Sequence, residues 1–226
     1  MEEIARPSYE DHTTLFNKDL ALCTDLYGMT DANNKLQSFF MTSWGKIQFR
    51  GRPLNSVFMG MSATRDDAKN SGNIRDVYRS FFEGVISKQK KTKEDYILWH
   101  TTITPSVCIA VEKIAKIRGD KCYPSLEDGA FDETGRELAM AIINAYDLPM
   151  ADASNPFLLR EFAVNTRYSE SERRRIARVK QKHNFSTFEK LGLLEEKGDR
   201  LLRAAIIRPQ NLRKQLLMYL THFKPF

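Results

Sequence analysis

The sequence predicts an all-α fold, a single helical domain of two lobes with extended N- and C-terminal arms, and it allows one short β-hairpin near residues 46–60. Apolar residues recur at helical spacing along most of the chain, and two capping boxes occur in its last third. The length of 226 residues is ample for a buried core. We expect an N-terminal arm over 1–12, a helical core over 13–220 that is basic from about 160, and a C-terminal arm over 221–226.

The first two helices are expected before residue 45. A helix over 16–27 is predicted because its apolar residues form one stripe, at Phe16, Leu20, Cys23 and Tyr27. Thr30 or Asp31 then caps a second helix, whose apolar stripe consists of Leu36, Phe39, Phe40 and Trp44. Between Gly45 and Met61 apolar and polar residues alternate, which favours the hairpin.

Three further helices are expected in the middle of the chain. The strongest begins at Asn73, with apolar residues on one side and charged residues on the other. A second pattern begins near Thr92 and meets Pro105, which kinks the helix or starts a new one that Gly119 stops. The third helix covers 133–146.

The last third contains the clearest start signals. Asn155 and Pro156 predict a short helix over 157–163. Capping boxes that begin at Ser169 and Ser186 each open a helix, the first of them running to His183. Helical patterns also cover 201–206 and 212–219.

The positive charge of the chain is concentrated near its C-terminus. The whole chain carries a net charge of +6, whereas 160–226 alone has 16 Lys and Arg against 7 Asp and Glu. Such asymmetry indicates a polyanion-binding segment, and the alternative is a solvated basic face. The densest cluster, which we expect to contact phosphates, is Arg167, Arg173, Arg174, Arg175, Arg178, Lys180 and Lys182.

The spacing of this cluster predicts a charged ridge on a packed helix. Arg174, Arg178 and Lys182 share one face, while Ile176 and Val179 point toward the core. Aromatic residues adjoin other cations, in Phe49-Arg50-Gly51-Arg52, Tyr78-Arg79 and Tyr168. These rings either stack on bases of a single strand or belong to the core.

Catalytic chemistry has one candidate, the carboxylates Glu127, Asp128, Asp132 and Glu133 near Lys121. Paired carboxylates can hold Mg²⁺ next to a phosphate. The alternative is that Asp132 or Thr134 caps the following helix. No nucleotide-binding or hydrolase motif occurs, and the four histidines are scattered, so we expect no metal, no cofactor and no enzymatic activity.

Composition also bears on the compartment. The longest apolar runs are far shorter than a membrane span, so no membrane helix is expected. The acidic N-terminus is unlike a secretory signal, so secretion by that route is not expected either. The three cysteines are widely spaced, which favours a reducing compartment.

Three segments resemble the coat proteins of flexuous filamentous plant viruses. The segment 73–82 is similar to the arginine-bearing central helix of that family, 129–132 to its Ala-Phe-Asp signature, and 166–173 to the opening of a late helix in one branch. The stretch 27–31 resembles a segment of another branch. The bulky aromatic residues that follow the signature in the family are replaced here by Glu133-Thr134-Gly135.

The resemblance implies a helical core, extended arms, and one RNA strand held in a groove with a Ser, an Arg and an Asp around a base. Arg75 matches the arginine and Asp132 the aspartate, and the serine has no matching position. Arg79, one turn after Arg75, is expected to contact the RNA together with them. The helical nucleoproteins of segmented negative-strand viruses share most of these expectations.

The sequence therefore predicts a viral coat or nucleocapsid-type protein, found in the virion and the host cytoplasm, that binds single-stranded RNA through its backbone. Its copies are expected to assemble head to tail into a helical filament, with Phe223 and Phe226 buried by a neighbouring subunit or folded back on their own core. The alternatives are a DNA-binding or replication accessory protein, with a winged-helix-like segment from Phe185 to Ile207, and an enzyme that uses the Asp132 cluster.

Overall fold

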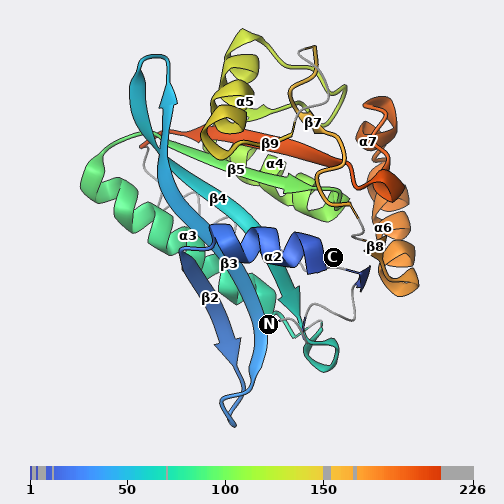
Figure 1. Cartoon of the computed structure of the whole chain (residues 1–226). Coiled ribbons are helices and arrows are strands. Elements are labelled where there is room, and N and C mark those ends of the chain that lie inside the picture. Colours follow the sequence, from blue (N-terminus) through green and yellow to red (C-terminus); the bar gives the residue numbers. More distant parts are fainter. Residues whose placement is uncertain are drawn as a thin grey trace.

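The structure, a computed structural model, describes residues 1, 4, 9–11, 13–69, 71–149, 154–164 and 167–209. A seven-stranded mixed sheet forms its centre, in the order β2-β3-β4-β5-β9-β6 with β7 also paired to β9 (Figure 1). The strands are β2 (Asp25–Thr30), β3 (Leu36–Phe49), β4 (Arg52–Thr64), β5 (Tyr96–Thr102), β6 (Cys122–Tyr123), β7 (Leu158–Leu159) and β9 (Arg200–Ile207). The predicted all-α fold is therefore wrong, and the protein has a mixed α and β fold.

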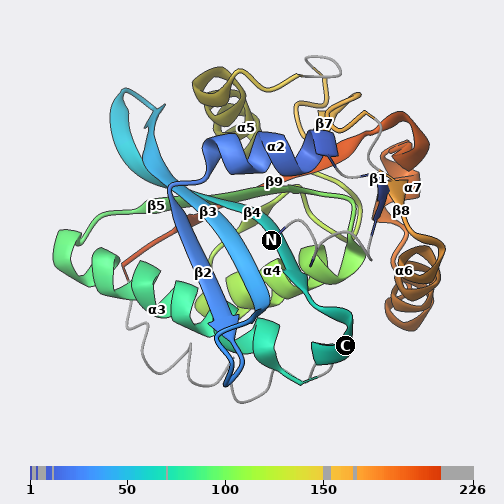
Figure 2. The same ribbon diagram turned by 60° about the horizontal axis from the view of Figure 1, so that its bottom comes forward.

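Helices cover both faces of this sheet (Figure 2). One face is packed against α3 (Asn73–Thr92) and α4 (Pro105–Arg118), the other against α2 (Thr13–Leu22) and α5 (Glu133–Tyr146). At one side of the molecule lie α6 (Glu170–His183) and α7 (Thr187–Lys190). A separate two-stranded sheet pairs β1 (Tyr9–Asp11) with β8 (Arg167–Tyr168), and the short 3₁₀ helices are η2 (Asp66–Ala68) and η3 (Glu195–Lys197).

The longest strand shows why the sequence predicted helices where strands occur. In β3, Phe39 and Met41 pack into the core on the α2 and α5 side, while Phe40 packs into the core on the α3 side. A strand buried on both faces has a continuous apolar run without alternation, and periodicity alone cannot distinguish such a run from a buried helix. The expected helix with Leu36 and Trp44 is therefore a strand.

The same reason applies to two more central strands. In β5, Trp99 faces one core and Leu98 the other. In β9, Leu202 and Ala205 likewise face opposite cores. The helical patterns expected from Thr92 and over 201–206 are thus wrong, because both segments are central strands.

Two other expected helices differ in part. The helix predicted over 16–27 ends at Leu22, and Tyr27 already lies in β2. The segment 157–163 contains β7 and turns instead of a helix. The hairpin expected near 46–60 is the end of the longer β3–β4 hairpin, which turns at Arg50 and Gly51.

Five predicted helices are confirmed, among them the short α7, which follows Ser186 although the Ser186 side chain makes no capping hydrogen bond. Pro105 lies in the first turn of α4 and Gly119 ends it in a left-handed conformation, with φ of 70°. Asp132 caps α5 and Ser169 caps α6. The predicted amphipathic helix from Asn73 is α3.

The expected arms fall largely on residues that the structure does not describe. Residues 221–226, and with them Phe223 and Phe226, lie outside the described residues, as does the helix predicted over 212–219. Of the first twelve residues, Tyr9–Asp11 form β1. Among the helices of the described ranges, each is too short or too polar to cross a membrane.

Candidate nucleic-acid interface

Helix α6 carries the predicted basic ridge, and the sequence fixes both of its ends. The Ser169 hydroxyl accepts a hydrogen bond from the Glu172 backbone N–H at 3.4 Å, and Asn184 ends the helix in a left-handed conformation. Acidic residues lie in the first turn and Lys180, Lys182 and His183 in the last, which suits the helix dipole.

The predicted division of α6 into two faces is confirmed. Ile176 and Val179 are buried in the same core cluster as the residues of α2 and α5, and α6 packs beside α4. Arg174, Arg178 and Lys182 are all exposed. We call these three residues the α6 ridge. A rise of about 1.5 Å per residue spaces them by about 6 Å along the helix.

Carboxylates neutralise part of the surrounding charge. Arg174 pairs with Glu170, and Arg175 pairs with Glu172. The Lys180 ammonium lies 2.6 Å from a carboxylate oxygen of Glu189. The Arg174 and Lys180 pairs are at the surface, so each contributes little stability and a phosphate can compete for the cation. Glu172 is buried and holds Arg175 by two N–H donors of the guanidinium.

Two members of the α6 ridge differ from these paired cations. Among the described residues, no carboxylate lies within ion-pair distance of Arg178 or Lys182. The neighbouring Arg173 donates a hydrogen bond to the Tyr168 carbonyl at 2.7 Å, which ties the start of the helix to β8. Arg167 is exposed on β8, just before α6 begins.

A further cation comes from α4. The pKa of His183 is lowered, first by burial of the imidazole and then by the positive charges of Lys113 and Lys182. Lys113 is therefore close enough to α6 to extend its positive field. Lys113 could not be predicted from the sequence, since only the packing of α4 beside α6 places it there.

The aromatic residues near the other cations belong to the core. Phe49 and Tyr168 are buried, and the Tyr168 hydroxyl lies 2.7 Å from that of Thr104. Tyr78 packs against Phe40 and its hydroxyl lies 2.9 Å from that of Ser62. Of the two interpretations of these rings, the structure supports the core, and base stacking has no support from them.

The structure does not bring Arg75 and Asp132 together. Arg75 and Arg79 lie on α3, where both are near the Asp76 carboxylate, at 3.6 and 3.4 Å. Asp132 lies at the start of α5, which packs on the opposite face of the sheet. A base pocket built from Arg75 and Asp132 is therefore not formed.

Asp132 has a structural role. Its carboxylate accepts a hydrogen bond from the Gly135 backbone N–H at 2.9 Å and pairs with the Lys121 ammonium at 2.6 Å. The Lys121 hydrogen bond is the main reason that the pKa of Asp132 is lowered. Within the described part of the chain, no group of three or more His, Cys, Asp or Glu side chains is arranged to hold a metal ion.

This role gives a testable difference between two substitutions. Asp132→Ala is expected to lower the free energy of unfolding by about 1 kcal/mol because α5 loses its cap, whereas Asp132→Asn keeps a capping side chain and loses less. Urea denaturation followed by circular dichroism measures both. Equal losses in the two variants would show that the carboxylate charge, and not the cap, is what matters.

The sequence matches no protein-family model, and no curated protein is significantly similar to it.

Proposed function

We propose that the protein binds nucleic acid through the phosphate backbone, on the α6 ridge and the cations around it. The observation that supports this most is a row of three exposed cations, one turn apart, on a helix whose other side is anchored in the core. Guanidinium and ammonium groups bind phosphate without reading the base sequence. The ligand we propose is single-stranded RNA, the one expected from the sequence.

The contact is electrostatic, which determines its properties. Its strength falls as salt rises, because each cation that binds a phosphate displaces counterions. The rings of Phe49, Tyr78 and Tyr168 are taken up by the core, so stacking by these residues cannot separate RNA from DNA. We therefore expect RNA and DNA strands of equal length to bind with similar affinity.

The proposal is tested with the triple variant Arg174→Gln, Arg178→Gln and Lys182→Gln. Fluorescence anisotropy with a labelled 20-nucleotide uridine strand at low salt is expected to show an affinity at least about tenfold lower than that of the wild type. The matched control is Lys46→Gln, Lys90→Gln and Lys91→Gln, which removes the same charge from exposed positions on β3 and α3. An equal loss in the control would refute the assignment to α6.

Filament assembly stays a prediction from the sequence. The helical core that the coat-protein resemblance implies is wrong, and the expected arms lie mainly outside the described residues. Size-exclusion chromatography of the wild type, with and without the uridine strand, separates the two claims. Long assemblies that form with RNA would support packaging, whereas a complex of one or two chains would support backbone binding alone.

Phe185 to Ile207, expected as a winged-helix-like segment in the alternative function, forms α7, η3 and β9. Strand β9 lies within the main sheet, between β5 and β6. The segment is thus part of the central fold and not a separate winged-helix unit.

A further inference from the structure

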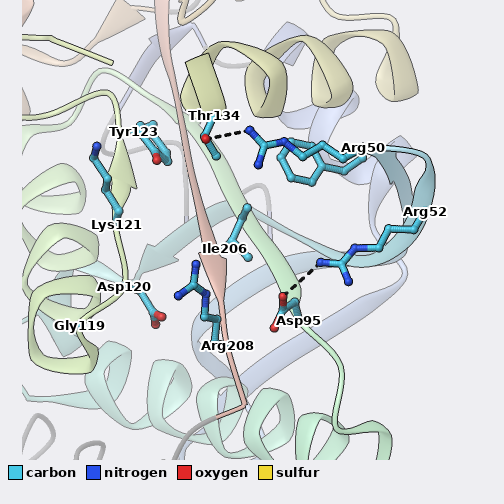
Figure 3. A pocket seen from close by; sticks show the side chains of 11 residues that line it. Arg50, Arg52, Asp95, Gly119, Asp120, Lys121, Tyr123, Thr134, Ile206 and Arg208 are labelled. Atoms are coloured by element: carbon cyan, nitrogen blue, oxygen red, sulfur yellow. Dashed lines mark hydrogen bonds and ion pairs between the residues drawn. The ribbon is translucent and has the colours of Figure 1, made fainter. Parts of the chain in front are cut away.

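A second cationic site lies at the end of the sheet where β3 turns into β4. A cleft of about 350 Å³ opens there between the hairpin tip, β6, the end of β9 and the start of α5 (Figure 3). The hairpin tip and α6 are on opposite sides of the molecule in both ribbon views (Figures 1 and 2). Its lining includes the cations Arg50, Arg52, Lys121 and Arg208 together with Tyr123 and Ile206.

Cations outnumber carboxylates on the wall of this cleft. Arg50, Arg52, Lys121 and Arg208 line it, against the two carboxylates Asp95 and Asp120. In the view of Figure 3, the three arginines surround Ile206. The lining thus contains two more cations than carboxylates, arranged around Ile206.

Carboxylates behind the wall hold two of these cations in place. Arg50 donates one hydrogen bond to Glu137 at 2.6 Å and another to the Thr134 hydroxyl at 2.9 Å. The Lys121 ammonium is held by Asp132. Neither Glu137 nor Asp132 lines the cleft. A guanidinium has five N–H donors, so Arg50 retains donors for a ligand after these bonds are made.

Arg52 is less constrained. Its side chain is 65% exposed, and its nearest carboxylate oxygen, on Asp95, is 3.6 Å away, which is beyond hydrogen-bond distance. The Arg52 donors are therefore available to an anion that enters the cleft.

The backbone at the hairpin tip supports a role for Arg50. Arg50 and Gly51 both have positive φ, 50° and 75°, as in the two-residue type I′ turn. Asn is favoured at the first position of that turn, and Arg is not. Holding an arginine there has a conformational cost, a pattern that is typical of functional positions.

We propose that this cleft binds a phosphate dianion, either inorganic phosphate or the terminal monoester phosphate of a nucleic-acid strand. Guanidinium forks match the oxygens of such a group, and Arg50 and Arg52 retain donors for it. The volume is at the lower end of the range for ligand pockets, which suits a small group or a strand end better than a continuous backbone. This inference does not rest on the α6 ridge.

Two variants test the cleft. Arg52→Gln with Arg208→Gln removes two donors from the wall. Arg50→Asn removes the third while placing the favoured residue in the turn, so its melting temperature is expected to equal or exceed that of the wild type. The matched control is Arg174→Gln with Arg178→Gln on α6, which changes the net charge as the first variant does.

The probes are inorganic phosphate and a uridine dinucleotide with either a 5′-phosphate or a 5′-hydroxyl, each titrated by calorimetry. We expect each cleft variant, but not the α6 control, to bind phosphate about tenfold more weakly, the loss that corresponds to one charge-assisted hydrogen bond. Tighter binding of the phosphorylated dinucleotide would identify a strand end as the ligand, and equal binding of the two dinucleotides would identify free phosphate. Phosphate binding that is absent in the wild type, or unchanged in both cleft variants, would overturn the proposal.

Discussion

Arg203→Met is expected to lower the free energy of unfolding by about 3 to 5 kcal/mol, because it removes one partner of a buried ion pair. The Arg203 side chain is fully buried on β9. One end of its guanidinium donates to the Cys108 carbonyl at 2.8 Å. The other end contacts Glu112 at 2.6 Å and the Pro124 carbonyl at 3.1 Å. Arg203 thus joins β9 to α4 and to the loop after β6.

Methionine fills similar space but cannot donate to Glu112, to the Cys108 carbonyl or to the Pro124 carbonyl. The Glu112 carboxylate, with 17% of its side chain exposed, would then lack its closest cation. Urea denaturation measures the loss, and Glu112→Gln in the Arg203→Met background is expected to recover part of it. A loss below about 1 kcal/mol would contradict this account. If the Met variant does not fold, the free energy of unfolding of Arg203→Lys is measured in its place.

His100→Leu is expected to protect the protein against acid. His100 is buried on β5 opposite Arg203, and both of its ring nitrogens lack a hydrogen-bond partner in the described part of the chain. Burial, and next the charge of Arg203, lowers the pKa of His100 to about 3. The unfolded chain takes up this proton below its ordinary pKa of 6.5, whereas the folded chain does not.

The free energy of unfolding therefore falls as pH drops from 6.5 toward 3, and Leu removes this loss. Relative to the wild type, the variant is expected to gain about 3 kcal/mol between pH 7 and pH 4, and nothing further above pH 7. Asp19 acts with the opposite sign, because burial raises its pKa to about 7 and the folded chain binds that proton first. The comparison must therefore be the difference between variant and wild type, measured by urea denaturation at each pH. A constant difference would contradict the assignment.

The helices that could be predicted from sequence are those whose signals are local. Pro105 with Gly119 marks α4, and Asp132 and Ser169 mark the starts of α5 and α6. The central strands could not be predicted in this way. Burial of β3, β5 and β9 on both faces depends on helices from distant parts of the chain, and it removes the alternation by which a strand is recognised.

The α6 ridge could be predicted for the same reason as the helix. The distance between Arg174 and Arg178 is set by the helix itself. The ion pairs on α6 also follow from sequence spacing, because Glu170 and Arg174 are four residues apart and Glu172 and Arg175 are three apart. The cleft was not predictable, since the Arg50 and Arg52 hairpin meets Arg208 only through the sheet.

The central claim is that phosphates bind at the α6 ridge, and the salt dependence of RNA binding tests it most directly. The slope of the logarithm of the binding constant against the logarithm of salt concentration counts the phosphates contacted, at about 0.7 per contact for a single strand. For the variant Arg174→Gln, Arg178→Gln and Lys182→Gln, we predict a slope smaller than that of the wild type by about 2. An unchanged slope would show that the ridge does not touch the backbone and would contradict the account.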